Sequence, residues 1–212
     1  MNRPHALVSR YSRALTLFVL ILASSFARAA TIDEFFDSFT AEWVRGNPDL
    51  ATSLRYFSGE EQDRLERQVT PRTRAYQLER IALARRGLSE LAKFDRAKLT
   101  ETQRVSAGLM QWQLERIVAR EPYIDYRYPL EQFNGDNVDL VETLTLRHPL
   151  VTPKDAENFL ARLALIDDRM NEALAEAERI ARAKMFPPRF IIDATLKQMK
   201  TFSEVAPEQN PI

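Results

Sequence analysis

Helix-start signals recur along this chain so often that they leave little room for other regular structure. In a capping box, a Ser or Thr hydroxyl accepts from the amide three residues later, where an acid or amide side chain reaches back. Starts of this kind occur at Thr31, Ser58, Thr100 and Thr152. The 212 residues include only five glycines, which argues against a β-rich fold with many tight turns. We therefore predict an all-α fold, a multi-helix bundle of about seven or eight helices.

The helix bounds follow from these starts and from apolar residues that recur every three or four positions. We expect one helix to begin at 58, and others over roughly 31–44, 48–57, 71–94, 100–120, 152–186 and 188–203. Asp167 and Asp168 mark a break or kink in the run that begins at 152. The helix over 100–120 is apolar on two faces, which favours a central place in the bundle. The buried stripe of the run after 152 is expected to be Ala156, Leu160, Leu163, Ile166, Met170, Leu174, Ala177 and Ala181.

Between residues 121 and 150 the helical spacing fails, and an irregular, aromatic and proline-rich connection is expected there. A helix or a short strand over 138–146 remains open. This connection supplies the candidate cleft or contact surface, because tyrosine suits contacts that are half wet. The alternative is a loop held to the bundle by its own rings. The candidate residues are Tyr123, Tyr126, Tyr128, Gln132, Phe133, Asn134 and His148.

No catalytic residue and no metal-binding residue is predicted. The chain has no cysteine, and its two histidines are His5 and His148. Zinc sites draw mainly on Cys and His, so we expect this chain to bind no cofactor by itself. His148, beside Pro149, is expected to be a hydrogen-bonded turn residue rather than a general base. The acids Glu131, Asp136, Asp139 and Glu142 depart from the spacing of a calcium loop and are interpreted as solvated loop acids.

The first 29 residues have the pattern of a secretory signal peptide, with cleavage between Ala29 and Ala30. They contain four arginines, no acid, and an apolar run over 14–26 that is short for a membrane span. An uncleaved amino-terminal anchor is the alternative. The protein is therefore expected to be exported, to the periplasm or outside a Gram-negative bacterium, with no stable membrane anchor after cleavage.

Without the four leader arginines, 26 basic residues face 30 acidic ones, a net charge of −4. A mildly acidic body argues against a nucleic-acid partner. The remaining chain divides into a helical domain over 30–203 and a tail over 204–212, which we expect to be truncated. The oligomeric state is left open.

Four blocks in order carry a resemblance to a known family. They are Tyr128–Gly135, Arg147–Leu150 with Thr152-Pro153, Asn158–Leu163, and Pro187–Arg189. Together they resemble the bacterial domain of unknown function 885 family, grouped with HExxH (gluzincin-like) metallopeptidases. The resemblance covers about 31–202, nearly all of the chain after the leader.

The resemblance implies that this chain corresponds to the amino-terminal helical part of a longer exported protein. Members carry the zinc-binding HExxH helix in a carboxy-terminal half, and no HExxH occurs here. The expected function is a helical segment that is not catalytic alone, with a peptide substrate or the missing half as partner. Zinc is expected only in a complete member. The alternative is a free-standing periplasmic helical binding or scaffold module.

Overall fold

The computed structural model describes residues 31–210 and 212. Within these residues it contains nine α-helices and no β-strand, which confirms the all-α prediction. The proposed leader and its cleavage site at Ala29 and Ala30 lie outside the described residues. The helices are α1 Ile32–Arg45, α2 Pro48–Leu54, α3 Gly59–Glu66, α4 Arg74–Leu91, α5 Glu101–Ala119, α6 Asp136–Glu142, α7 Pro153–Leu163, α8 Ile166–Arg182 and α9 Arg189–Ser203.

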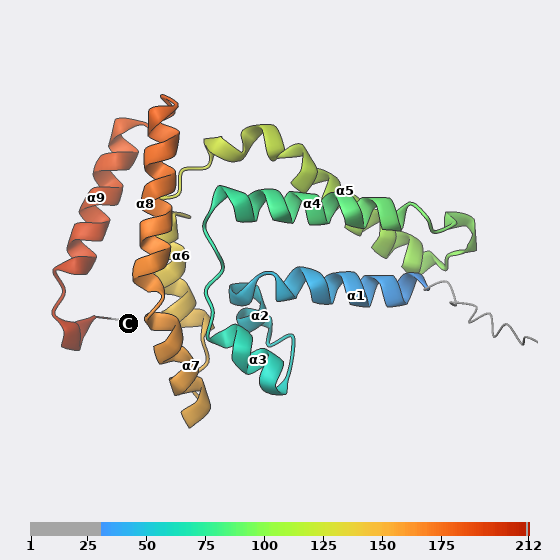
Figure 1. Ribbon diagram of the computed structural model, residues 1–212, viewed down its shortest axis with the longest axis horizontal. Coiled ribbons are helices and arrows are strands. Elements are labelled where there is room, and N and C mark those ends of the chain that lie inside the picture. Colours follow the sequence, from blue (N-terminus) through green and yellow to red (C-terminus); the bar gives the residue numbers. More distant parts are fainter. Residues whose placement is uncertain (1–30, 211) are drawn as a thin grey trace, which may run out of the picture.

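The helices form two groups that meet along the extended segment 67–73 between α3 and α4. Helices α1, α4 and α5 run along one axis and extend to one side, as Figure 1 shows. Helices α8 and α9 cross that axis at the other end, and α2, α3 and α7 lie near the junction. None of the helices in the described part is long and apolar enough to cross a bilayer.

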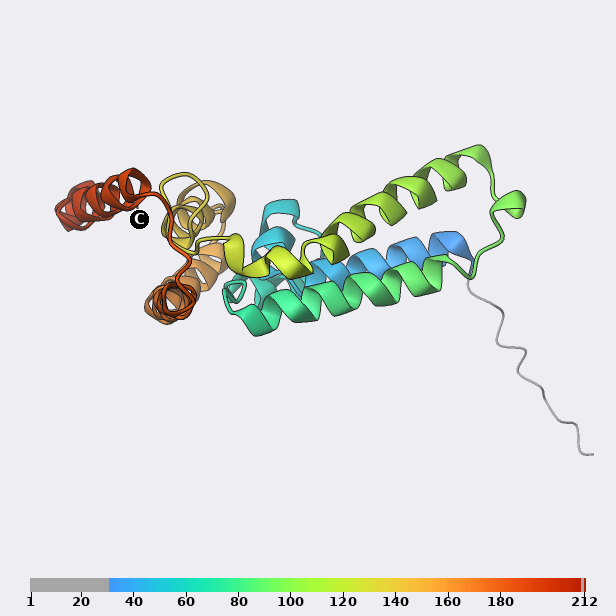
Figure 2. The same ribbon diagram turned by 90° about the horizontal axis from the view of Figure 1, so that it is seen from above.

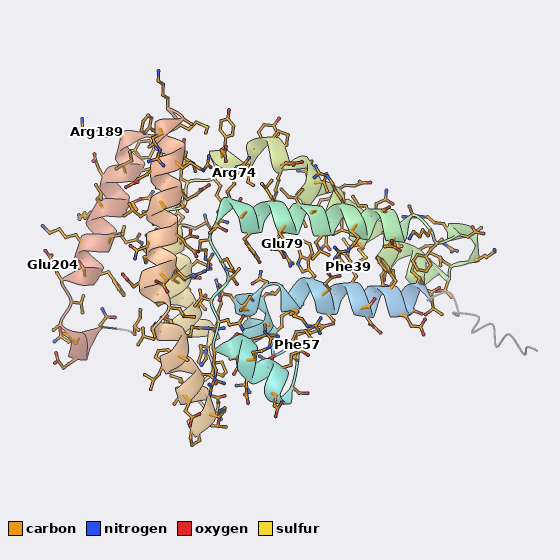
Figure 3. All side chains as sticks on the ribbon, in the orientation of Figure 1. Phe39, Phe57, Arg74, Glu79, Arg189 and Glu204 are labelled. Carbon is orange, nitrogen blue, oxygen red and sulfur yellow. The ribbon has the colours of Figure 1, made fainter. Side chains whose placement is uncertain are left out.

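Helices α1, α4 and α5 form a layer with α4 in the middle, which we call the α1–α4–α5 layer. Phe39 of α1, Leu83 and Ala84 of α4, and Leu114 of α5 make one buried cluster. Phe39 points from α1 toward α4 (Figure 3). A second cluster, of Ile32, Leu91 and Ala107, closes the far end. Apolar packing therefore holds this layer together.

The central position expected for the helix over 100–120 is wrong, because α4 occupies it. Helix α5 packs on α4 through one face, and its other apolar face is open. On that face Val105, Leu109 and Trp112 are 67%, 54% and 58% exposed. An apolar second face therefore does not identify a central helix here.

Three of the predicted helix starts are confirmed in detail. Thr31 with Glu34, Thr100 with Gln103, and Thr152 with Asp155 each form a reciprocal capping box. The start at Ser58 is correct in position, but the Ser58 side chain makes no cap hydrogen bond. Its expected partner Glu61 instead pairs with Arg45 of α1, with Nε 2.6 Å from Oε1. A contact between helices thus replaces the local box.

Two predicted helix bounds are wrong, namely the start of α4 and the end of α2. Helix α4 begins at Arg74, with Thr73 as N-cap, and not at Thr70-Pro71. Thr70 is held elsewhere, because its hydroxyl donates to Asn47 Oδ1 at 2.8 Å. Helix α2 ends at Leu54 and not Phe57, since Arg55 adopts a left-handed conformation with φ 45°. The chain is therefore extended where it passes between the two groups.

The buried face predicted for the run after 152 is wrong in α7. Asp155, Asn158 and Arg162 are buried, whereas Leu160 is 64% exposed. The neighbours of α7 are the polar ends of α2 and α3, so its polar side turns inward. The run also breaks at Ala164 and Leu165, before the expected Asp167-Asp168.

The connection over 121–150 is more regular than predicted. It contains a 3₁₀ helix η2 (Glu121–Tyr126), helix α6, and a π-helical turn η3 (Thr143–Arg147). Of the two options for 138–146, the helix is correct. Within it, residues 127–135 and 148–150 are irregular. The π-helical turn ends at His148, whose amide donates to Thr143 O at 2.9 Å. The π-helical turn therefore leads directly to the buried polar residue His148.

Candidate functional site

Segment 67–73 carries Arg72 into a group of acids from other elements. The Nη2 atom of Arg72 lies 3.0 Å from Asp49 Oδ2 of α2 and 2.6 Å from Asp139 Oδ2 of α6. Its Nη1 atom lies 3.4 Å from Asp136 Oδ1. Arg147 joins through Asp139, with Nη1 2.7 Å from Oδ1. We call these five residues the Arg72 cluster.

The pKa values of the charged groups in the Arg72 cluster are shifted in different directions. Burial lowers the pKa of Arg72, but the charges of Asp136, Asp139 and Asp49 outweigh it, so the pKa lies above its ordinary value. Burial raises the pKa of Asp136 despite its arginine neighbours. For Asp139 burial acts upward too, but Arg72 and Arg147 bring its pKa below the usual range. Asp139 therefore holds its negative charge more firmly than Asp136 does.

Two hollows flank Arg72. One of about 360 Å³ is bounded by Asp49, Arg72, Asp139 and Arg147 together with Asn47, Leu50, Ser53 and Thr70. The other, of about 160 Å³, lies toward Arg127, Asp136 and Glu176. Most of the residues that line the two hollows are charged or polar, so the hollows suit water or small polar groups.

The Arg72 cluster is not a metal site. Three carboxylates converge, but the Arg72 guanidinium stands among them and supplies the positive charge that a metal ion would bring. In the described part of the chain, no three His, Cys, Asp or Glu side chains are placed to hold a metal ion. The cluster therefore joins α2, α6 and the segment before α4 by internal ion pairing.

A second buried polar group surrounds Arg162 of α7, which is 0% exposed. Its Nη2 donates to Thr52 Oγ1 at 2.6 Å and to Leu65 O at 3.1 Å, and its Nε donates to Gln68 O at 2.8 Å. All three acceptors are neutral. Burial lowers the pKa of Arg162, and Asp49 and Glu66 only partly oppose this. We call Arg162 with these acceptors and His148 the Arg162 network.

His148 lies inside the Arg162 network with both ring nitrogens engaged. Arg162 Nη1 lies 3.2 Å from His148 Nδ1, and His148 Nε2 lies 2.9 Å from Asp155 O. Because a guanidinium only donates, Nδ1 accepts and Nε2 donates, which is the neutral tautomer. Burial lowers the pKa of His148, in agreement with a neutral ring. In this geometry neither nitrogen is free to bind a metal or to take a proton.

One comparison with known proteins identifies a family. The model of the family described as "Bacterial protein of unknown function (DUF885)" matches residues 48–212, well over half of the chain. This chain belongs to the DUF885 family. No curated protein and no solved structure matches it.

In this DUF885 chain the candidate contact residues do not gather on one surface. Tyr123 and Tyr126 lie together on η2, 66% and 64% exposed, with ring centroids 6.2 Å apart. They border a hollow of about 450 Å³ against α4 and α5. His148 is buried in the Arg162 network, away from these rings.

The remaining candidates lie in the loop before α6. Gln132 O accepts from Gln198 Nε2 of α9 at 3.3 Å, and the Asn134 amide donates to Glu131. Phe133 is 71% exposed and Tyr128 is half-buried. The structure thus separates the aromatic pair on η2 from a loop that contacts α9.

The residues that organise the interior of this DUF885 chain were missed in the sequence. Asp136 and Asp139 were interpreted as solvated loop acids, yet Asp136 is 3% exposed. Arg162 and Asn158 lie outside the apolar stripe that the sequence predicts to be buried. One signal was present, because Asp155, Asn158 and Arg162 form a polar stripe at helical spacing beside a helix start. Composition alone assigns such a stripe to solvent.

Proposed function

We propose that this chain is the non-catalytic, amino-terminal helical part of an exported DUF885 protein related to HExxH metallopeptidases. The observation that carries the proposal is the state of His148, the one histidine in the described part of the chain. Both of its nitrogens are engaged beside the Arg162 guanidinium. A peptidase centre must then come from further chain, and this chain supplies a helical support for it.

The metallopeptidase resemblance implies a zinc ion, and the donor set of this chain does not fit one. Protein zinc sites use Cys, His and carboxylate ligands. Cysteine is absent from the sequence, and the carboxylates that converge do so around an arginine. No catalytic step is therefore assigned to these residues.

Apolar surface on the last helices supports a covering partner. Phe186, Phe190, Leu174 and Leu196 are 50–69% exposed along α8, α9 and the turn between them. A largely apolar hollow of about 350 Å³ lies between α6, α8 and α9, with Leu144, Met170 and Phe202 among its walls. Large exposed apolar surface commonly marks a protein interface. A carboxy-terminal half of the kind that the family resemblance implies is the partner that we propose for this surface.

A free-standing helical binding module is the second candidate. The exposed pair Tyr123 and Tyr126 favours it, because the hollow beside them is also bordered by Tyr76 and Arg120. Such rings provide contact area at low entropic cost. In this case the η2 surface is the contact site and no further chain is needed.

The test combines zinc analysis with the downstream reading frame. The exported chain, dialysed against zinc and then against buffer, is expected to retain far less than one zinc per chain and to cleave no peptide. The gene is expected to continue into, or to be interrupted before, an HExxH segment. Stoichiometric tight zinc or chelator-sensitive peptidase activity overturns the proposal. A clean stop followed by an unrelated gene favours the binding module, and secretion is checked by cell fractionation.

A further inference from the structure

A long apolar groove runs between α1 and α5 on the open face of the α1–α4–α5 layer. It has a volume of about 760 Å³. Its walls are Phe36, Thr40 and Trp43 on α1, and Leu109, Trp112 and Arg116 on α5. Figure 2 shows α5 crossing at an angle to α1 and α4, so that the helices diverge toward the start of α5.

The two walls run in the same direction. Helix α1 is antiparallel to α4, because Ile32 packs near Leu91 while Arg80 donates to Trp43 O at 2.7 Å. Helix α5 is also antiparallel to α4, since Ala107 joins Leu91 and Leu114 joins Leu83. The carboxy-terminal ends of α1 and α5 therefore lie at the same end of the groove.

That end of the groove is positively charged. Arg116 and Arg120 of α5 both border the groove. Neither is within ion-pair distance of a carboxylate in the described residues, whereas Arg85 of α4 and Arg45 of α1 are both paired. The carbonyl ends of α1 and α5 also point this way, and they favour the positive end of another helix dipole.

We propose that this groove binds an amphipathic helix that lies antiparallel to α1 and α5, with an acidic first turn beside Arg116 and Arg120. The apolar positions of such a helix, spaced by three and four residues, pack between Trp43 and Trp112 in the helix-in-groove mode. Its amino terminus meets the carbonyl ends of both walls, and its acids pair with the two arginines. The proposal goes beyond the proposed function and does not require it, because no metal or catalytic half is involved.

The test uses two labelled peptides with one composition. Each is an amphipathic helix of about 15 residues, long enough to follow the groove. One has two Glu in its first turn and two Lys in its last, and the other has these charges exchanged. Fluorescence anisotropy with the full chain is expected to give about tenfold tighter binding for the peptide with the acidic first turn. Trp112→Ala is expected to weaken both.

A charge-reversed chain removes the contribution of peptide helicity, because both chains see the same two peptides. Arg116→Glu with Arg120→Glu is expected to abolish or invert the preference. The matched control is Arg182→Glu with Arg189→Glu, which changes the net charge equally on exposed parts of α8 and α9. This control is expected to leave the preference intact.

Three results overturn the proposal. They are equal or absent binding of the two peptides, a preference that survives reversal of Arg116 and Arg120, and self-association through the groove. The last is seen by sedimentation as a dimer that Trp112→Glu dissociates, which identifies a second copy as the occupant.

Discussion

Helices α1, α4 and α5 are held together by rings and aliphatic side chains, whereas charged and amide groups join α6 and α7 to α2, α3 and segment 67–73. Phe39, Leu83 and Leu114 meet in the α1–α4–α5 layer. The Arg162 network and the Arg72 cluster form a polar seam along segment 67–73. The stability of apolar packing depends on side-chain volume and not on pH. The stability of an ion pair is lost when either partner is removed or when protonation changes its charge. The two regions should therefore fail for different reasons.

The largest effect is expected in the polar seam, at Arg162. Arg162→Met leaves Thr52 Oγ1, Leu65 O and Gln68 O without their donor in a buried place. The free energy of unfolding should fall by about 3–5 kcal/mol. Urea denaturation followed by circular dichroism measures it. Arg182→Met on exposed α8 is the control and should change stability by less than about 0.5 kcal/mol. A loss no larger than the control's shows that the seam contributes little.

The layer should respond to added volume at one glycine and not at another. A Cβ on Gly87 of α4 overlaps the Phe39 ring and comes within 2.9 Å of Leu114 Cδ1, whereas a Cβ on Gly108 of α5 meets open space. Gly87→Ala should cost about 1–3 kcal/mol through overpacking. Gly108→Ala should stabilise by about 0.5–1 kcal/mol, because Gly is a poor helix former. Thermal denaturation compares them, and similar shifts in both variants contradict this picture of the layer.

Lowering the pH should destabilise the polar seam before the α1–α4–α5 layer, and this is the smallest of the expected effects. The folded pKa of Asp139 is depressed, so its stabilisation is present above its unfolded pKa, about 3.9, and is lost as pH falls through the folded pKa. Asp125 and Asp155, whose pKa values are also lowered, add to the loss. Asp136, with a raised pKa, partly offsets it, because its contribution is lost as pH rises.

Both tryptophans, Trp43 and Trp112, lie in the α1–α4–α5 layer, so their emission reports on that region alone. On acid titration the helical dichroism should therefore fall at higher pH than the tryptophan emission changes. Asp139→Asn should lower stability at neutral pH by about 1–2 kcal/mol and make the acid transition shallower. If helical dichroism and tryptophan emission of the unaltered chain change at the same pH, the two regions do not unfold independently.

Local signals in the sequence are enough to predict where helices begin, but not which face of a helix is buried. The starts at Thr31, Thr100 and Thr152 were predictable because a capping box is complete within four residues. The side of α7 that faces inward was not, because it depends on acceptors at Thr52 and Gln68, far away in sequence.

The same distinction between local signals and long-range contacts explains which residues of the candidate site can be named from the sequence. Tyr123 and Tyr126 can be named as candidates because aromatic residues in an irregular stretch are visible in a sequence, and the structure places both rings on the surface. The Arg72 cluster was not, because its acids come from α2 and α6 and look like ordinary surface charges until the chain folds. Helix α5 was placed wrongly for a related reason, since its second apolar face is the wall of a groove.

The order in which these contacts can form follows from their spacing along the chain. Helices α4 and α5 are neighbours in sequence, so they can pair as soon as both have been synthesised. Arg162 reaches acceptors 94 to 110 residues earlier, so Thr52, Leu65 and Gln68 remain hydrated until α7 arrives. We therefore expect closure around Arg162 to be a late step of folding, so that a nascent chain stalled before residue 162 carries a packed α1–α4–α5 layer beside an open, hydrated junction.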